Sequence, residues 1–324
     1  MTGGDSRPVS DQTIDDAVLP FAVEALDLRG CLVRLGPSID GILSRHGYPP
    51  PVARLLGEAA ALTVLLGSSL KQQGRFQLQA RTDGVVDMIV VDFDSPDRLR
   101  AFARFDAERL AAAEAGGAAS SAQLLGAGHL GFTIDPGGAM QRYQGVVAVS
   151  GEGLEAAAHE YFHRSEQIPT LVRLAVGQIV TAGGPHWRAG GLIVQFLPES
   201  YERRRQADLH PGDAPEGTPA HDIAEDEAWI EGRSHAATVE DHELIDPSLS
   251  GERLLYRLYH ERGVRVFAAE EVRDQCRCST DSIRAMLQRF TPQERADMIG
   301  DDGMIGVTCE FCSQKREFDP KAFG

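Results

Sequence analysis

The chain has 324 residues, of which 42% are hydrophobic and 25% charged, and its formal net charge is −16. This composition is that of a globular protein long enough for two domains, and the excess of negative charge argues against a nucleic-acid-binding protein, which normally presents a basic surface. Because no apolar run approaches the roughly 20 residues that span a bilayer, and no apolar signal stretch opens the chain, we predict a cytoplasmic protein with no membrane partner and with reduced thiols.

The N-terminal part is predicted to begin with a disordered polar tail, residues 1–18, and to continue with strands and helices. Short apolar stretches predict strands over Leu19–Val23 and Cys31–Leu35, and Cys31 is expected to be an inert buried thiol. A run of three prolines then fits a first helical turn. The Ala- and Leu-rich run that follows, Val52–Lys71, is apolar on most faces and predicts a buried helix.

Two hairpins are predicted further along. Arg75–Arg81 and Val85–Phe93 flank an Asp-Gly pair, which supplies the positive-φ residues of a tight turn. Asp97–Ala113 has the pattern of an amphipathic helix, and the second hairpin covers Leu130–Val149. A helix over Gly153–Phe162 and strands over Thr170–Thr181 and Trp187–Phe196 complete the series. We therefore predict an α+β fold for residues 19–198, with a mixed or antiparallel sheet.

An acidic stretch follows this domain. Between Glu199 and Ser250, fourteen acidic residues stand against four arginines, so the stretch carries −10 of the net charge. Sequence so poor in apolar residues does not easily offset the entropy of ordering, which favours a solvated linker. The alternative is a marginally stable helical layer, docked in one state and melted in another. An amphipathic helix over 252–262 and a short strand over 264–267 come next, and we assign residues 199–268 to an acidic linker with helices.

Four cysteines mark the last part of the chain, residues 269–324. Cys276 and Cys278 form a C-x-C motif, Cys309 and Cys312 form a C-x-x-C motif, and thirty residues separate the pairs. Four thiolates in two close pairs suit a tetrahedral zinc site, and a module of this size, too small for a good core, would be stabilised by the metal. Helices capped near Ser279 and at Thr291, and a hairpin over 304–318, are predicted within this domain.

Three readings of the cysteines remain open. A structural zinc ribbon would serve as an interaction module. A redox switch would lose its metal when an oxidant attacks the electron-rich sulfurs, and the module would then unfold. A thiol-disulfide oxidoreductase would need its C-x-x-C at the start of a helix, whereas Cys309 and Cys312 are predicted to lie at a hairpin turn.

One further motif resembles a catalytic site. His159, Glu160 and His163 match H-E-x-x-H, the zinc-protease helix motif. The following residues do not extend the longer metzincin pattern, and no third ligand is evident, so we interpret them as surface histidines on an amphipathic helix. No phosphate-binding or nucleophile motif is present in the sequence. We therefore predict neither an enzyme nor a nucleotide-binding protein.

The chain resembles the thirty-three-kilodalton heat-shock chaperones of bacteria, which are redox-regulated holdases. The stretches that carry the resemblance are Tyr143–Val147, Tyr161–Phe162, Arg164–Thr170, Gly190–Gln195, Leu258–Glu261, Asp302-Gly303 and the four cysteines. They span nearly the whole chain, and the C-x-C and C-x-x-C at this separation are highly specific. The acidic stretch Glu199–Asp246 is longer than the family pattern leads us to expect.

The resemblance implies a mechanism. In the reduced, inactive protein, Cys276, Cys278, Cys309 and Cys312 would hold one Zn²⁺ per chain. Oxidation by peroxide or a hypochlorous-type oxidant would release the zinc and form Cys276–Cys278 and Cys309–Cys312 disulfides. The module and linker would then unfold, and the activated protein, a homodimer, would hold unfolding client proteins without ATP.

Overall fold

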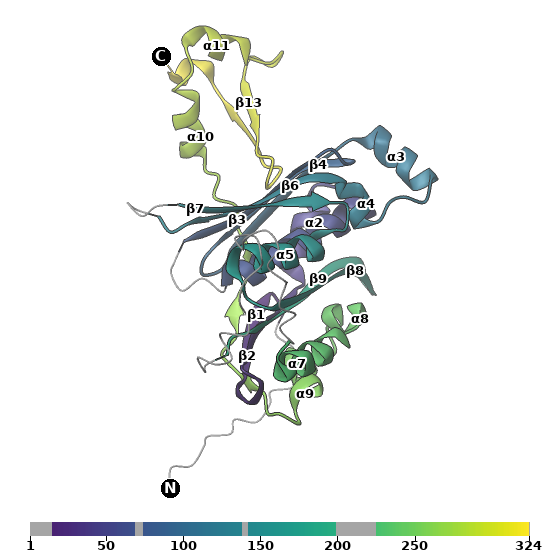
Figure 1. Cartoon of the computed structure of the whole chain (residues 1–324). Helices are drawn as coiled ribbons and strands as arrows, with labels where there is room; N and C mark the ends of the chain where they lie inside the picture. Colours follow the sequence, from purple (N-terminus) through teal and green to yellow (C-terminus); the bar gives the residue numbers. More distant parts are fainter. Residues whose placement is uncertain (1–14, 69–73, 138–141, 199–224, 324) are drawn as a thin grey trace, which may run out of the picture.

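The computed structural model describes residues 15–68, 74–137, 142–198 and 225–323. Two sheets lie one above the other with helix α2 between them, a layer of helices covers the lower sheet, and a C-terminal module stands on the upper one (Figure 1). This arrangement confirms the predicted α+β class. The predicted tail lies largely outside the described residues, and its last two residues already belong to the first strand, which begins at Ala17.

The lower sheet, sheet A, has six strands, all in antiparallel pairs. The strand order is β10-β1-β2-β9-β8, and β11 also pairs with β1. Its strands are β1 (Ala17–Val23), β2 (Leu28–Leu35), β8 (Thr170–Thr181), β9 (Gly184–Phe196), β10 (Arg265–Val266) and β11 (Glu270–Glu271). The strands predicted around Cys31 and over 170–181 and 187–196 are confirmed.

The upper sheet, sheet B, also has six strands, in the order β12-β5-β4-β3-β6-β7. All its pairs are antiparallel except β12 with β5. Its strands are β3 (Arg75–Thr82), β4 (Val86–Asp94), β5 (Arg98–Phe105), β6 (Ala127–Asp135), β7 (Tyr143–Ser150) and β12 (Arg273–Asp274). Both predicted hairpins are therefore present. Strands β10, β11 and β12 bring the chain after the linker back to the edges of both sheets.

Helix α2 (Pro50–Ser68) forms the centre of the core, in contact with both sheets. It is long and apolar enough to cross a membrane by length and composition, so the sequence statement that no run approaches this length was too strict. However, 78% of its most apolar window is buried inside the fold, as predicted for a core helix. The other helices of this part are α1 (Pro37–Arg45), α3 (Ala107–Ala115), α4 (Ser121–Leu125) and α5 (Leu154–Tyr161).

Two local predictions were wrong. The helix predicted over 97–113 is strand β5 followed by the short helix α3, because Leu99, Ala101 and Ala103 alternate into the core and Asp106 caps the helix behind them. The Asp-Gly turn after β3 has no positive φ. Gly84 is needed there for space instead, since a Cβ on it would lie 2.3 Å from the carbonyl oxygen of Leu124.

The described part of the acidic stretch is an ordered layer, which we call the acidic layer: α7 (Glu227–Ala237), α8 (Asp241–Ile245) and α9 (Gly251–Tyr259). The solvated linker favoured from the sequence is therefore wrong for these residues, and the docked helical layer is correct. The layer and sheet A enclose a second apolar core, to which Trp229, Leu244 and Leu258 contribute from the layer and Phe21 and Phe196 from the sheet. Residues 199–224 lie outside the described part.

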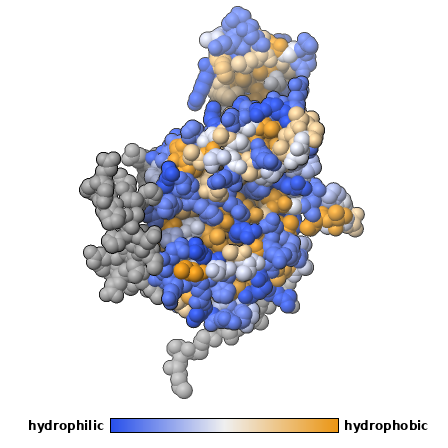
Figure 2. Space-filling view, turned by 45° about the vertical axis from the view of Figure 1, so that its right-hand side comes forward, coloured by the Kyte–Doolittle hydropathy of each residue, from blue (hydrophilic) through white to orange (hydrophobic). Residues whose placement is uncertain are grey.

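The C-terminal module, residues 276–323, is a separate lobe in Figure 2, where apolar residues break its otherwise hydrophilic surface. It contains α10 (Thr280–Leu287), α11 (Pro292–Asp297), β13 (Ile305–Thr308) and β14 (Lys315–Phe318). The predicted caps at Ser279 and Thr291 are both present as capping boxes. Its buried core is only Ile283, Leu287, Ile305 and Phe318. So small a core leaves the module dependent on some other source of stability.

Candidate metal centre

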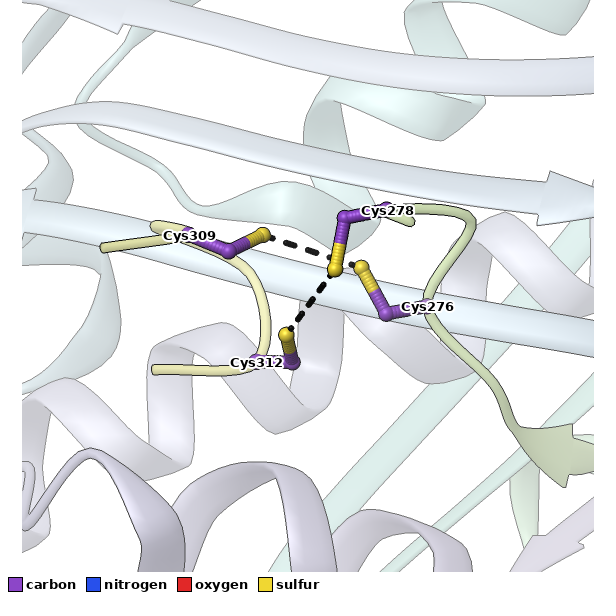
Figure 3. A group of neighbouring side chains, drawn as sticks. All are labelled: Cys276, Cys278, Cys309 and Cys312. Atoms are coloured by element: carbon purple, nitrogen blue, oxygen red, sulfur yellow. Dashed lines mark hydrogen bonds between the residues drawn. The ribbon is translucent and has the colours of Figure 1, made fainter. Parts of the chain in front are cut away.

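The four cysteines of the two motifs meet at the base of the C-terminal module (Figure 3). Their sulfur atoms all lie within 4.8 Å of one another. Cys276 Sγ is 3.8 Å from Cys309 Sγ, and Cys278 Sγ is 3.4 Å from Cys312 Sγ. Four sulfurs at about 2.3 Å from a tetrahedral Zn²⁺ would be about 3.8 Å apart, so the donor set fits a closed zinc site without an open ligand position.

Local backbone structure presents both pairs. Cys309 and Cys312 stand in the turn of the β13–β14 hairpin, where the Ser313 N–H donates to the Cys309 carbonyl at 2.8 Å and Ser313 takes a left-handed φ of 55°. Cys276 follows strand β12, and the preceding Gln275 N–H still donates to the Leu99 carbonyl at 3.1 Å. Cys278 directly precedes the N-cap of α10. A strand end, a helix start and a hairpin turn therefore converge on one point.

The thiols differ in acidity. Burial opposes ionisation of Cys278, but hydrogen bonds from Cys312, Cys276 and Arg316 together lower its pKa to about 7. Arg316 Nη1 lies 3.4 Å from the Cys278 sulfur. Burial, together with the hydrogen bonds it donates to neighbouring sulfurs, raises the pKa of Cys312 to about 12. Cys278 is thus the thiol that ionises most readily, and thiolates are both the metal ligands and the groups that oxidants attack.

Two arginines at this site were not predicted from the sequence. Arg316 faces Cys278 because β14 is paired with β13, and Arg100 of β5 interacts electrostatically with the Cys276 thiol. Arg100 was missed because its segment was predicted to be helical. The alternation of Arg98, Arg100 and Arg104 with small apolar residues is the signal that would have placed these arginines on one face of a strand.

The other candidate ligands do not join the cluster. His159 Nε2 accepts the Val172 N–H at 2.9 Å, so this nitrogen ties α5 to β8. Helix α5 ends at Tyr161, and His163 lies in the π-turn that follows, outside the regular helix that H-E-x-x-H requires. His159 is partly buried rather than on the surface as predicted. Cys31 is also only partly buried, in β2, where it packs against the main core.

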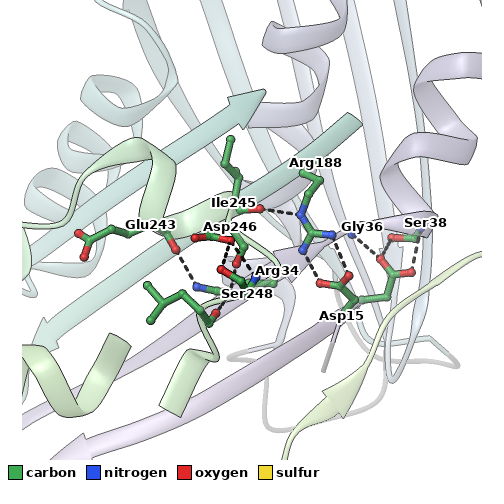
Figure 4. Close-up of polar contacts among 11 residues, drawn as sticks. Asp15, Arg34, Gly36, Ser38, Arg188, Glu243, Ile245, Asp246 and Ser248 are labelled. Atoms are coloured by element: carbon green, nitrogen blue, oxygen red, sulfur yellow. Dashed lines mark hydrogen bonds and ion pairs between the residues drawn. The ribbon is translucent and has the colours of Figure 1, made fainter. Parts of the chain in front are cut away.

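A second polar site fastens the acidic layer to sheet A (Figure 4). Arg34 of β2 donates to the carbonyls of Glu243 at 2.7 Å and Asp246 at 2.8 Å, and also to that of Leu249. Arg188 of β9 donates to the Ile245 carbonyl at 2.6 Å. Both arginines are 4% exposed. They occupy carbonyls at and beyond the end of α8, which a helix cannot satisfy internally.

Comparisons with known proteins show the family to which the chain belongs. The model of the family described as Hsp33 protein matches residues 16–319. A 33 kDa chaperonin of Caulobacter vibrioides (strain NA1000 / CB15N) is 44% identical over 308 residues, which cover 95% of this chain and 96% of that protein. A 33 kDa chaperonin of Pseudomonas aeruginosa (strain LESB58) is 35% identical over 300 residues, 92% of this chain and 90% of that protein.

A solved structure has the same fold. The crystal structure of the 33 kDa chaperonin of Thermotoga maritima matches with a TM-score of 0.71 at 18% identity, covering 95% of this chain and 96% of that one. Together the matches define a chaperone rather than an enzyme. The chain belongs to the Hsp33 family, the 33 kDa chaperonins, a family of redox-regulated holdases. The resemblance found in the sequence is confirmed.

Proposed function

We propose that Cys276, Cys278, Cys309 and Cys312 hold one Zn²⁺ in the reduced cytoplasmic protein, and that their oxidation converts an inactive form into a holdase. The observation that carries this proposal is the convergence of four sulfurs within 4.8 Å. When bound, zinc would supply tetrahedral ligation and the stability that the four-residue core of the module lacks. The cysteines themselves would sense the oxidant.

The redox step needs two electrons for each disulfide. Two thiolates give up two electrons to a peroxide, whose O–O bond breaks, and two protons complete two water molecules as the S–S bond forms. We assign the bonds to Cys276–Cys278 and Cys309–Cys312, although the sulfur contacts at 3.8 and 3.4 Å each join cysteines of opposite motifs. Once two ligands are lost, the metal no longer bridges the two motifs, whereas the cysteines of one motif stay neighbours along the chain.

The acidic layer is the element that oxidation would release. It covers the outer face of sheet A, including Phe21, Leu192 and Phe196, all at most 4% exposed. Melting of the layer would bare this face as an apolar surface for unfolding client proteins, without ATP. We further propose that the activated form is a homodimer, and that the net charge of −16 keeps it dispersed while this surface is open.

Two other functions would give different experimental results. A structural zinc ribbon would lose its partner binding on oxidation and gain nothing. An oxidoreductase would reduce disulfides without zinc, but it would need its C-x-x-C at the start of a helix, whereas Cys309 and Cys312 stand in a hairpin turn.

One experiment separates these functions. Zinc release is followed with a chromogenic chelator while light scattering records the aggregation of a heat-denatured client, before and after peroxide treatment of the full chain. We expect about one zinc per chain to be released and aggregation to be suppressed only afterwards. Loss of zinc without suppression would favour the ribbon, and zinc-independent turnover of a disulfide substrate would favour the oxidoreductase.

A further inference from the structure

We propose that the residues enclosed by the two cysteine motifs, Arg277 and Phe311, dock the reduced metal centre onto the outer face of sheet B, with Asp92 as the receiving group. We further propose that this docking sets how readily the centre is oxidised. The inference rests on the proposed function and names a regulatory contact within it. In Figure 1 the turn of the β13–β14 hairpin points at the sheet that contains β4.

Arg277, between Cys276 and Cys278, reaches a carboxylate that is almost fully buried. Its Nη2 lies 2.8 Å from Asp92 Oδ2, and its Nε lies 3.0 Å from Asp94 Oδ2. The Asp92 side chain is only 1% exposed, while that of Arg277 is 25% exposed. Asp92 also accepts hydrogen bonds from Arg100 Nε at 2.8 Å and Gln77 Nε2 at 2.7 Å. A buried carboxylate held by two arginines gives the docked module a fixed position.

Phe311, between Cys309 and Cys312, makes the second contact. The Arg100 guanidinium lies 4.0 Å from the centre of the Phe311 ring, and the Phe102 ring centre is 6.2 Å away. His46, the C-cap of α1, also contacts the hairpin, with Nε2 3.1 Å from the Phe311 carbonyl oxygen. Arg100 thus contacts the second motif through Phe311, and it also interacts electrostatically with the Cys276 thiol of the first. The sulfurs are partly covered by this contact.

Charge explains why docking would respond to oxidation. Four thiolates around Zn²⁺ carry a formal charge of about −2. Together with Asp92 and Asp94 they balance four arginines that bond to the sulfurs or to these two aspartates: Arg75, Arg100, Arg277 and Arg316. Two disulfides without zinc are neutral, so oxidation leaves two positive charges in excess at the contact. Like charges at a partly buried interface repel, which favours undocking.

The backbone adds a second reason. Arg277 lies between the two sulfurs that the first disulfide would join. Closing an S–S bond between Cys276 and Cys278 forms a small ring that includes the Arg277 backbone, and this ring constrains the direction of its side chain. The two electrons pass to the peroxide as above. Oxidation of Cys276 and Cys278 would therefore change the contact between Arg277 and Asp92.

The test uses the reduced, zinc-loaded full chain with Arg277→Ala, Arg277→Lys and a control, Arg284→Ala. Arg284 lies in the same module, and its ion pair with Asp281 is internal to α10. Asp92 keeps Arg100 and Gln77 in every variant, so sheet B stays folded. Three quantities are measured: amide exchange over 275–279 and 309–313, the rate of peroxide-driven zinc release, and zinc affinity against a chelator without oxidant.

We expect Arg277→Ala to raise amide exchange at both motifs and the release rate by about ten-fold, while zinc affinity stays within about two-fold. Arg277→Lys should fall in between, because a lysine keeps the charge but loses the guanidinium hydrogen bond to Asp92. Arg284→Ala should match the wild type. Release and exchange in Arg277→Ala equal to those of the wild type would overturn the inference.

The results for the wild-type protein distinguish a failure of the docking inference from a failure of the proposed function. If the wild type releases zinc and then suppresses aggregation while Arg277→Ala behaves identically, only the docking inference fails. If the wild type neither releases zinc nor suppresses aggregation, the proposed function fails, whatever the variants do. Amide exchange in the reduced form reports docking in either case, because it needs no oxidant.

Discussion

Tyr259 of α9 stacks on Phe21 of β1, with ring centres 5.9 Å apart and both side chains 1% exposed. The Tyr259 hydroxyl donates to the Gly232 carbonyl of α7 at 3.1 Å. One side chain therefore holds two helices of the acidic layer together and fixes them to sheet A. Its position makes it a direct probe of how firmly the layer is docked.

Replacing this tyrosine should loosen the layer. Tyr259→Ala removes a buried ring and should destabilise the docked layer by about 3–5 kcal/mol. Tyr259→Phe loses only the hydrogen bond, at a cost of about 1 kcal/mol. Urea denaturation followed by tryptophan fluorescence measures both, since Trp229 lies in the same core. We also expect reduced Tyr259→Ala to suppress client aggregation partially without peroxide. A variant as inactive as the wild type would show that undocking is not enough.

The arginine contact under the layer gives a second prediction. Arg34→Met leaves the carbonyls of Glu243 and Asp246 buried without their donor and should cost about 2–4 kcal/mol. The matched control is Arg262→Gln, which breaks an exposed ion pair with Glu231 of α7 and should lower the free energy of unfolding far less than Arg34→Met does. The two free energies of unfolding are compared in the reduced protein. Equal costs would contradict the role given to Arg34.

The metal ligands are tested by conservative substitution. Cys276→Ser and Cys309→Ser each remove one of four thiolates, so we expect zinc affinity to fall by at least about 100-fold. Cys31→Ser is the control, since Cys31 lies in β2 away from the cluster and should leave one zinc per chain. Chelator competition with metal analysis measures both. Unchanged stoichiometry and affinity in the two ligand variants would reject the assigned site.

A partly buried carboxyl in α2 predicts a pH dependence. Burial raises the pKa of Glu58 from 4.5 to about 7, aided by the nearby acidic groups of Glu155 and Asp241 and opposed by a hydrogen bond from Ser121. The folded chain therefore binds this proton more tightly than the unfolded chain does. Its contribution to stability is present below about pH 4.5 and is lost as the pH rises toward 7.

Glu58→Gln should remove this dependence. We expect the variant to be more stable than the wild type by about 1–3 kcal/mol at pH 8 and nearly equal to it at pH 4.5. Urea denaturation of the reduced, zinc-loaded protein across this range gives the difference. A constant difference between the two proteins at all pH values would show that Glu58 does not titrate in this window.

Local signals predicted much of the fold and the cluster. Capping residues at Ser279 and Thr291, the hairpins and the apolar helix α2 each have a short-range pattern with one physical meaning. The cluster of four cysteines was predicted from their spacing and from the reducing compartment expected for the chain. The helix wrongly predicted over 97–113 failed because alternating arginines and small apolar residues satisfy both periodicities over a short span, and only the neighbouring strand β4 decides between them.

The acidic layer needed tertiary information. Before α9 its sequence is rich in acidic residues, and the large apolar residues that dock α7 and α8, such as Trp229 and Leu244, are few. The evidence for a docked layer lies in sheet A instead. Strands β1 and β9 are buried on both faces, so another element must cover the side of sheet A away from α2. Likewise, Arg34 and Arg277 gain their roles only from carbonyls and carboxylates more than 150 residues away. Such contacts have no local pattern.

The central claim is that oxidation of the cysteines unfolds the module and the acidic layer and thereby exposes a client-binding surface. Hydrogen exchange of the amides of α7 and α9, compared before and after peroxide treatment that releases the zinc, tests it most directly. We predict that protection of these helices is lost together with the zinc, while α2 keeps its protection. If the oxidised, zinc-free protein suppresses client aggregation with α7 and α9 still protected, the account is contradicted.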